Sequence, residues 1–354
     1  MDLRQSVLRE FHFNMYWDYA LVVGYGSIGK RHVTQLETIS KKILIVDPQN
    51  LQHGIPSNSK SVQTLEQVPL NRSGKSVAVI SNWGPSHLKT LTELAEMGFR
   101  NLILEKPMTT SLEELFELRK IKEIFGLNIL INQGWNYSDF YSLISTLQNT
   151  YSLGSPIAIW SVGGARCIST AGSHIVHLAT RLFDSPALSF TASLNFQRIN
   201  PRSDSLDYVD GTASIEYGTG EKLGLNFTNQ SSLEGMTFIY WRNHVAEVHA
   251  TGQFKLKSNL NLVASTDKIT RYAPSGTTLY DTENQEIPVR IDNMDSIHAV
   301  SLDSFASTSQ IDFANHCTSA FNLLMIMNAG VEKRTLYPKD ADKKLIFERK
   351  FSIS

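Results

Sequence analysis

Cysteine, net charge and long apolar runs are all scarce in this sequence of 354 residues. Only Cys167 and Cys317 occur, far apart and outside any CxxC or Cys/His cluster, which argues against a disulfide scaffold and a structural zinc site. Lys and Arg number 33 against 34 Asp and Glu, without clustering, so the charge pattern argues against a broad surface for nucleic acid or anionic lipid. No apolar run could span a bilayer, and the first residues lack the apolar core of a signal peptide. We therefore expect a cytoplasmic protein with a small-molecule partner, and neither a nucleic-acid nor a membrane partner.

Two domains are expected from the length and from a change of pattern near Gln133. The chain exceeds the usual size of one hydrophobic core, and 42% hydrophobic with 19% charged residues is an ordinary globular composition. Before Gln133, continuous apolar runs alternate with helical spacing, which is typical of a parallel sheet buried on both faces. The runs are YALVV (19–23), ILIVD (43–47), SVAVIS (76–81), NLILE (101–105) and NILIN (128–132).

Beyond Gln133 the strand candidates alternate polar and apolar residues, which predicts a mostly antiparallel sheet. They are SPIAIWSV (155–162), ALSFTASLNFQRI (187–199), KLGLNFTNQ (222–230) and MTFIYWRNHVAEVHA (236–250). Helices are expected at 173–183 and 313–327. The turn-rich stretch 266–297 is expected to be an irregular surface excursion.

The segment GYGSIG, from Gly24 to Gly29, follows a buried-type strand and opens a helical segment. Asp47 ends the next strand about 20 residues on, the spacing that brings a carboxylate to a ribose hydroxyl. Gly24 permits a tight turn, Gly26 lets a pyrophosphate approach the backbone, and Gly29 lets helix and strand pack. The motif predicts a dinucleotide site made of Gly24, Tyr25, Gly26, Ser27, Ile28, Gly29 and Asp47. NAD is favoured because Asp47 would repel a 2′-phosphate, while Arg31 and Lys41 keep NADP possible.

The fold class that follows is α/β, with an N-terminal Rossmann domain and a mostly antiparallel sheet in the second half. We place an N-terminal extension at residues 1–18, the Rossmann dinucleotide-binding domain at 19–133, and a second domain at 134–354. Residues 1–14 are either a frayed arm or lie upstream of a start at Met15.

LILEKPM (102–108), at the end of a sheet strand, together with GYGSIG, resembles the Gfo/Idh/MocA family, named after glucose-fructose oxidoreductase and inositol dehydrogenase. SNWGPSH (81–87) is similar to that family's strand-to-helix turn beside the cofactor. The resemblance implies that residues 134–354 are a substrate-binding and oligomerisation domain, a C-terminal α/β domain with a large, mostly antiparallel open sheet that commonly makes an oligomer contact. It also implies hydride transfer between a nicotinamide and a sugar-like hydroxyl or ketone. It adds Ser81, Asn82, Trp83, His87, Glu105, Lys106 and Pro107 to the expected cofactor site.

Lys106 is the first candidate catalytic residue. Ligands of open α/β sheets bind at the carboxyl ends of the strands, which is where Lys106 stands. A lysine there can hydrogen-bond the reacting oxygen and share its proton. A solvated surface lysine is the alternative, which the flanking Glu105 and Pro107 disfavour. The resemblance also implies a cis bond between Lys106 and Pro107.

His174 is the second candidate catalytic residue, because the family's general acid/base falls on it and histidine titrates near neutrality. The family usually places an aspartate four positions earlier, where this chain has Thr170. A hydroxyl stabilises the positive charge of an imidazolium less than a carboxylate does. Three consequences are open: Lys106 carries more of the proton transfer, the reaction runs mainly as ketone reduction, or catalysis has been lost. His177 is interpreted as a core histidine, and we expect no metal site because no third ligand is evident.

The expected substrate pocket combines polar and aromatic side chains, since sugars are held by stacking and hydrogen bonds. Its candidates are Trp135, Asn136, Tyr137, Trp160, Arg166, Thr170 and His174, with Tyr240 to Arg242 in addition. The sequence thus favours an NAD(P)-dependent sugar or nucleotide-sugar dehydrogenase or reductase that acts on CH–OH groups in carbohydrate or surface-polysaccharide metabolism. We expect it to form a homo-oligomer, a dimer or tetramer. The alternative is a catalytically silent regulatory protein that senses the cofactor or a sugar.

Overall fold

The computed structural model describes most of the chain. The described residues are 17–49, 51, 55–70, 75–133, 135–164, 167–197, 207–232, 235–249, 253–258, 277–284, 297–300 and 302–353. Residues 1–14, expected to be an arm or an upstream segment, and Arg166, expected in the substrate pocket, both lie outside these ranges.

Six strands of the described residues form a parallel sheet in the order β3-β2-β1-β4-β5-β6. They are β1 (Tyr19–Val23), β2 (Ile43–Val46), β3 (Ser59–Val62), β4 (Ser76–Ile80), β5 (Asn101–Glu105) and β6 (Asn128–Asn132). This strand order is that of a doubly wound dinucleotide-binding sheet, with the first strand at its centre. The predicted Rossmann fold is confirmed.

Helices cover both faces of this sheet, which explains why its central strands are apolar without alternation. Side chains of α1 (Ser27–Ile39), such as Val33 and Leu36, pack on one face. Side chains of α2 (His87–Glu96) and α3 (Leu112–Phe125), such as Leu94 and Leu118, pack on the other. Each strand residue therefore meets an apolar layer whichever way it points.

The second sheet has eight strands among the described residues, in the order β14-β13-β12-β11-β7-β10-β9-β8. Neighbours pair antiparallel except β7 and β10, which are parallel. This agrees with the prediction of a mostly antiparallel sheet. The strands are β7 (Ala158–Gly164), β8 (Ala187–Gln197), β9 (Tyr208–Tyr217), β10 (Lys222–Thr228), β11 (Met236–Tyr240), β12 (His244–His249), β13 (Phe254–Ser258) and β14 (Thr277–Asp281).

Helices cover one face of the second sheet. Helix α5 (Ser173–Leu182) follows a π-helical turn, η4 (Ile168–Gly172), and packs on this face, as does part of α4 (Phe140–Tyr151). On the opposite face Trp160, Val162 and Tyr240 are 43%, 40% and 38% exposed, while their neighbour Ile159 is buried beneath the helices. Within the described ranges this face has no helix layer, which agrees with the open sheet that the resemblance implies.

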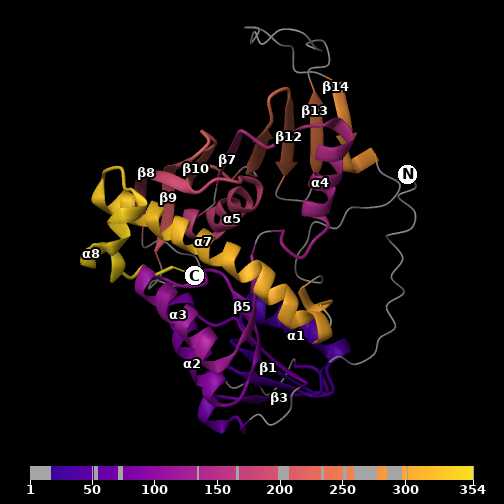
Figure 1. The fold of residues 1–354 in the computed structure, drawn as a ribbon. Helices are drawn as coiled ribbons and strands as arrows, with labels where there is room; N and C mark the ends of the chain where they lie inside the picture. Colours follow the sequence, from indigo (N-terminus) through magenta and orange to yellow (C-terminus); the bar gives the residue numbers. More distant parts are fainter. Residues whose placement is uncertain are drawn as a thin grey trace.

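Helix α7 (Leu302–Glu332) ties the two halves of the molecule together. It runs across the molecule in Figure 1, between the first sheet below and the second sheet above. Its Ala320 belongs to the core of the first sheet, and its residues 323–327 belong to the core of the second. No helix among the described residues, α7 included, is both long and apolar enough to cross a membrane.

Beyond β9, β13 and α4, which no expected element covered, four features differ from the prediction, one in the first half and three in the second. Strand β3 has the polar sequence SKSV and sits at a sheet edge, so it carries no apolar run to predict it. The expected strand at 236–250 is a hairpin, β11 and β12, and the helix expected at 313–327 extends over the whole of α7. Within 266–297, expected to be irregular, 277–281 forms β14 and pairs with β13, while 266–276 and 285–296 lie outside the described residues.

Candidate active site

The glycine loop joins the end of β1 to the start of α1 at the carboxyl edge of the parallel sheet. Gly24 has φ +93°, and a Cβ there would lie 2.7 Å from the backbone of Asn82. A Cβ on Gly29 would lie 1.9 Å from the carbonyl oxygen of Gly24. Both positions therefore admit only glycine, for the turn and for helix-to-strand packing respectively.

Gly26 differs from its two neighbours because a Cβ there would meet nothing within 4 Å. The protein itself gives no steric reason for glycine at this position. Gly26 is also the N-cap of α1, whose first turn has no capping side chain and no acidic residue. An uncapped helix N-terminus beside open space is the arrangement that receives a phosphate.

Asp47 follows β2 and closes the glycine loop from the side. Its Oδ2 accepts a hydrogen bond from the amide of Tyr25 at 2.7 Å, and its Oδ1 accepts one from the amide of Gln49 at 2.9 Å. The carboxylate is half-buried at the sheet edge, where the ribose is expected. Lys41, which kept NADP possible, follows the far end of α1 and pairs with Asp18.

The turn after β4 supports the loop from the other side. The hydroxyl of Ser81 donates to the carbonyl oxygens of Val23 and Gly24, at 3.1 and 2.9 Å. The amide of Asn82 donates to Thr90 at 2.8 Å, while its Oδ1 is buried without a hydrogen-bond partner among the described residues. Trp83 is 41% exposed.

His87, at the start of α2, connects this turn to the segment after β5. Its Nδ1 lies 2.9 Å from the carbonyl oxygen of Pro107, and its Nε2 lies 3.2 Å from that of Asn82. Burial lowers the pKa of His87, although both carbonyl oxygens oppose the shift. A neutral ring donates only one of these two bonds.

Residues 351–353 pack behind the same turn. The amide of Phe351 donates to the carbonyl oxygen of Thr110 at 3.0 Å, and Ile353 is fully buried. A Cβ on Gly84 would lie 2.4 Å from the carbonyl oxygen of Ile353, so glycine is required where the two segments meet.

Lys106 follows β5, and the Lys106–Pro107 bond is cis, as the resemblance implies. The preceding Glu105 is buried, and its Oε1 accepts hydrogen bonds from His32 Nε2 at 2.8 Å and Asn132 Nδ2 at 2.6 Å. Burial raises the pKa of Glu105, but the hydrogen bond and charge of His32, with Asn132 and Lys106, outweigh it, and the pKa is lowered. Glu105 is therefore ionised, and its buried carboxylate fixes the backbone next to Lys106 through these hydrogen bonds.

A second histidine continues this buried network. His298 Nε2 lies 2.7 Å from His32 Nδ1, and the two rings meet edge-on at 5.0 Å between centroids. Both side chains are almost fully buried, and burial lowers the pKa of His298 well below its ordinary value. His298 is therefore neutral, and the negative charge of this buried network lies on the Glu105 carboxylate.

The end of β6 connects the Lys106 segment to α5. Asn132 bonds Glu105, as described above, and the adjacent Gln133 donates from Nε2 to the carbonyl oxygen of Ser173 at 2.8 Å. Ser173 is the first residue of α5 and precedes His174, which is half-buried. Two consecutive side chains thus join the immediate neighbours of Lys106 and His174.

Thr170 lies in the η4 turn just before α5. Its Oγ1 donates to the carbonyl oxygen of Cys167 at 3.4 Å, and its own carbonyl oxygen accepts from the Ser173 hydroxyl at 2.6 Å. The side chain present at the family's aspartate position is thus bonded to the backbone of its own turn.

His177 lies in the core between α5 and α7. Its Nδ1 lies 2.9 Å from the hydroxyl of Ser319, and its ring stacks on His316 with centroids 4.4 Å apart. Burial lowers the pKa of His177 well below its ordinary value, with smaller contributions from His316 and Arg181. This position agrees with the interpretation of His177 as a core residue.

The expected substrate residues do not all lie together. The Asn136 amide lies 3.4 Å from both His177 and His316, so it faces the histidine stack. Trp135 stacks on Phe140 at 4.7 Å, against the core of the second sheet. Trp160 is on the open face of the second sheet, opposite the face that α5 covers, so the fold does not bring it to the side where His174 lies.

Several residues of the site were not anticipated from the sequence. Asn132 and Gln133 end an apolar strand at the carboxyl edge, so the rule that singled out Lys106 also points to them. His32 stands on the strand-facing side of α1, a position where a polar residue is a signal. His298 has no such signal, because its partner is 266 residues away in the sequence.

Together, the strand order, the glycine loop and the polar edge define a dinucleotide-binding α/β protein with a second, sheet-based domain. Residues 19–127 match the family described as "Oxidoreductase family, NAD-binding Rossmann fold", which is the Gfo/Idh/MocA family. The match covers the N-terminal domain, where it identifies an NAD-binding Rossmann fold of this type, and the predicted cofactor class is confirmed. No curated protein matches the sequence.

Solved structures share the fold over nearly the whole chain. An NAD-binding protein from Listeria innocua has a TM-score of 0.66 at 15% identity, over 91% of this chain and 97% of its own. Levoglucosan dehydrogenase in complex with NADH has a TM-score of 0.67 at 11% identity, over 90% and 98%. UDP-N-acetylglucosamine 3-dehydrogenase from Acidithiobacillus ferrooxidans has a TM-score of 0.63 at 13% identity, over 88% and 97%.

The residues present fit a dinucleotide. Open space beside Gly26, the uncapped start of α1 and the half-buried carboxylate of Asp47 provide for the pyrophosphate and a ribose. Within the described ranges, no three His, Cys, Asp or Glu side chains gather in a way that could hold a metal ion.

Proposed function

We propose that this chain is an NAD-dependent oxidoreductase that transfers hydride between the nicotinamide and a hydroxyl or ketone of a sugar or nucleotide-sugar. The observation that carries the proposal is the link through β6. Asn132 binds the residue before Lys106, and Gln133 binds the residue before His174. Two sugar dehydrogenases with the same fold support the choice of substrate class.

NAD is proposed over NADP because of Asp47. Its carboxylate accepts hydrogen bonds from two backbone amides at the edge where a 2′-phosphate would lie, and the two groups would repel each other. Lys41 is engaged with Asp18 and follows the other end of α1, so it does not offset this repulsion.

Lys106 and His174 divide the proton chemistry at one oxygen. When bound, the nicotinamide accepts or supplies the hydride at the neighbouring carbon. In the oxidation direction His174 takes the hydroxyl proton, and in reduction it returns that proton to the new alkoxide. The ammonium group of Lys106 hydrogen-bonds the same oxygen and stabilises its developing negative charge. Glu105, His32 and Asn132 hold the Lys106 segment in place.

Turnover tests the roles of these residues. The protein is mixed with NAD or NADH and a panel of sugars, nucleotide-sugars and keto-sugars, and nicotinamide absorbance is followed. We expect Lys106→Ala to lower kcat about 100-fold or more, because it removes charge stabilisation and proton sharing. Lys120→Ala is the control, since Lys120 is an exposed residue of α3 that pairs with Glu117. An unchanged rate in Lys106→Ala would rule out the role of this lysine.

A cofactor- or sugar-sensing regulatory protein is the second candidate. Thr170 favours it, because the hydroxyl at the family's carboxylate position is bonded to the backbone of Cys167. Binding of NADH, measured by its fluorescence, without turnover on any member of the panel would support this candidate over the enzyme.

A further inference from the structure

His298 lies in the segment 297–300, just ahead of α7, and brings a residue of the second half of the chain into the buried network around Glu105. Its Nε2 lies 2.7 Å from Nδ1 of His32, which is on α1 of the Rossmann domain. The two residues are 4% and 0% exposed, and their ring planes meet at 76°. His32 in turn bonds Glu105, the residue before Lys106. The network therefore runs from the segment ahead of α7 to the backbone beside Lys106.

The direction of these hydrogen bonds follows from the donors and acceptors present. A neutral imidazole carries one N–H, and burial lowers the pKa of His298 well below its ordinary value, so its ring is neutral. Its Nδ1 is buried without a partner in the described part of the chain, so a proton there would be an unpaired donor. The proton therefore belongs on Nε2 and is donated to His32. His32 then donates from its own Nε2 to Glu105, whose ionised carboxylate only accepts.

His32 is thus held at both ring nitrogens. The bond to Glu105 alone would leave the ring able to turn about its side-chain torsions, whereas a second bond on the opposite side fixes its orientation. The orientation of the ring decides where the Glu105 carboxylate lies, together with the bond that Asn132 donates from the end of β6. The carboxylate in turn fixes the backbone that carries Lys106.

Apolar packing anchors the residues on both sides of His298. Ile297 and Phe305 are each 1% exposed and belong to the same core as Val33 and Leu36 of α1. Phe305 is itself on α7. His298 is therefore presented to α1 by a segment whose position is determined by the core.

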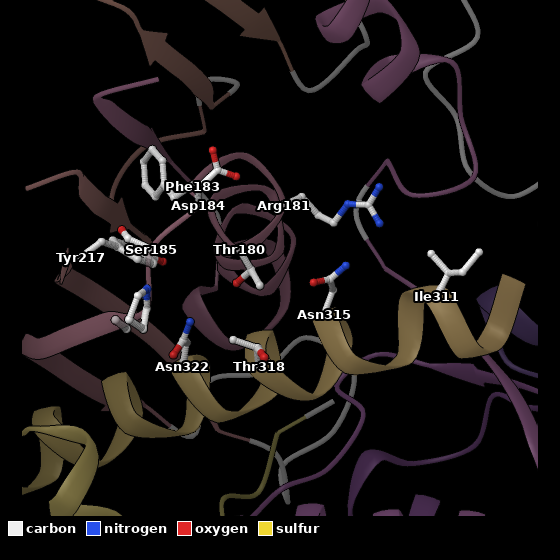
Figure 2. A pocket seen from close by; sticks show the side chains of 12 residues that line it. Thr180, Arg181, Phe183, Asp184, Ser185, Tyr217, Ile311, Asn315, Thr318 and Asn322 are labelled. Carbon is white, nitrogen blue, oxygen red and sulfur yellow. The ribbon is translucent and has the colours of Figure 1, made fainter. Parts of the chain in front are cut away.

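Helix α7 continues this connection to the helix that carries the second candidate catalytic residue. Figure 2 shows α7 passing beside α5, with Thr180 of α5 and Asn315 of α7 pointing toward the space between the two helices. Arg181 of α5 donates to Asp312 of α7 at 2.8 Å. His174 is the second residue of α5. The packing of α7 thus joins the segment ahead of it to the helix of His174.

We propose that His298 is a positioning residue for the hydride-transfer site. As a donor to His32 it fixes the ring that orients the Glu105 carboxylate, and so holds Lys106 where the reacting oxygen binds. The effect on Lys106 rests on the proposed function, whereas the hydrogen bond itself does not. The edge of the Rossmann sheet that carries Lys106 is therefore complete only when the segment ahead of α7 is docked on α1.

Three variants of the full chain separate positioning from stability. His298→Phe keeps a ring but removes the donor, His298→Gln offers an amide N–H in its place, and Phe305→Leu thins the adjoining core without removing a hydrogen bond. We expect His298→Phe to lower kcat about 3- to 10-fold, while His298→Gln and Phe305→Leu stay within about twofold of wild type. KM for the dinucleotide should stay within about twofold in all three, because the glycine loop keeps its place.

Nuclear magnetic resonance tests the same network without turnover. In protein with isotope-labelled histidine rings, a scalar coupling across the hydrogen bond should join Nε2 of His298 to Nδ1 of His32. In the NADH complex the side-chain signal of Lys106, assigned by its loss in Lys106→Ala, should move in His298→Phe and return in His298→Gln. A wild type without turnover on any member of the substrate panel would contradict the proposed function, and these two signals would then decide the role of His298.

Three results would overturn the proposal. They are a missing coupling in wild type, an unchanged kcat and Lys106 signal in His298→Phe, and an equal loss of kcat in Phe305→Leu, since the loss would then follow from stability alone. Thermal melts check that the variants are folded at the assay temperature. The coupling is measured in wild type, so the network is tested even where a substitution disrupts folding.

Discussion

At the scale of single residues, the three glycines of the loop are glycine for different physical reasons. Gly24 and Gly29 are required by the protein, since a Cβ at either would collide with backbone. Gly26 has open space beside it. The sequence motif predicts all three glycines together. The structure shows which two the fold requires, Gly24 and Gly29, and which one is left for a ligand, Gly26.

Alanine substitutions at two of these glycines should therefore have different effects. Gly29→Ala should destabilise the domain by several kcal/mol, because its Cβ would lie 1.9 Å from the Gly24 carbonyl oxygen. Gly26→Ala should leave the apo protein as stable as wild type but weaken NADH binding about tenfold or more, because the methyl group enters the space expected for the pyrophosphate. Urea unfolding and fluorescence titration measure the two effects. Equal NADH affinity in Gly26→Ala and wild type would contradict the placement of the pyrophosphate.

Among the polar residues, some could be found from local sequence motifs and others only from the fold. Motif spacing singled out Lys106 and Asp47 as candidates at the carboxyl edge of the sheet, and the resemblance implied the cis bond between Lys106 and Pro107, which the structure contains. It could not show that Asn136 faces two histidines, because His316 is distant in the sequence and its contact arises from packing of α7. Contacts between remote segments have no local pattern to reveal them.

At the scale of elements, α5 and α7 are joined by a buried pair of stacked histidines. Burial lowers the pKa of His316 to about 3, with a smaller contribution from the Arg181 charge. Ser319 and Asn136 contact the pair, the charges of Arg181 and His174 act on it, and Arg181 is itself paired with Asp312. The pair is packed as two neutral rings.

This junction predicts acid sensitivity. The unfolded chain binds a proton at position 316 below an ordinary pKa near 6.5, but the folded chain does so only near 3. Unfolding therefore takes up a proton between these values, and stability falls as the pH falls through this window. His316 alone should cost about 2 kcal/mol between pH 7 and pH 5. His316→Phe keeps a ring against His177 but binds no proton, so urea unfolding should show a smaller loss. Equal losses in the variant and wild type would contradict the assignment.

Element prediction succeeded where the sequence pattern was strong. The apolar strands β1, β2, β4, β5 and β6 are recognisable because helices bury both of their faces. Strand β3 was missed because an edge strand with the sequence SKSV owes its place to pairing with β2. Helix α7 was predicted too short, because its first half packs on the Rossmann domain and its apolar positions follow two different surfaces.

At the scale of the whole molecule, one face of the second sheet has no helix layer among the residues that the structure describes. Trp160 and Tyr240 are exposed there on neighbouring strands β7 and β11. Exposed aromatic side chains on a sheet face indicate an interaction surface. We propose, following the family resemblance, that a second copy of this chain covers it.

A single charge should separate the copies. Trp160→Glu is expected to convert an oligomer to a monomer in size-exclusion chromatography with light scattering, because it buries a carboxylate opposite apolar side chains. Leu345→Glu is the control, since Leu345 is 78% exposed on α8 (Lys344–Phe347). A wild type that is already monomeric, or a variant of unchanged mass, would contradict this surface.

The contact between Gly84 and Ile353 affects the order in which the protein can be completed during translation. Residues 19–133 leave the ribosome first, yet the turn that holds Asn82 and His87 stays unsupported on one side until residue 353 emerges. A nascent chain can form β1 and α1 early, but the packing behind the turn is complete only when synthesis has passed the second sheet and α7.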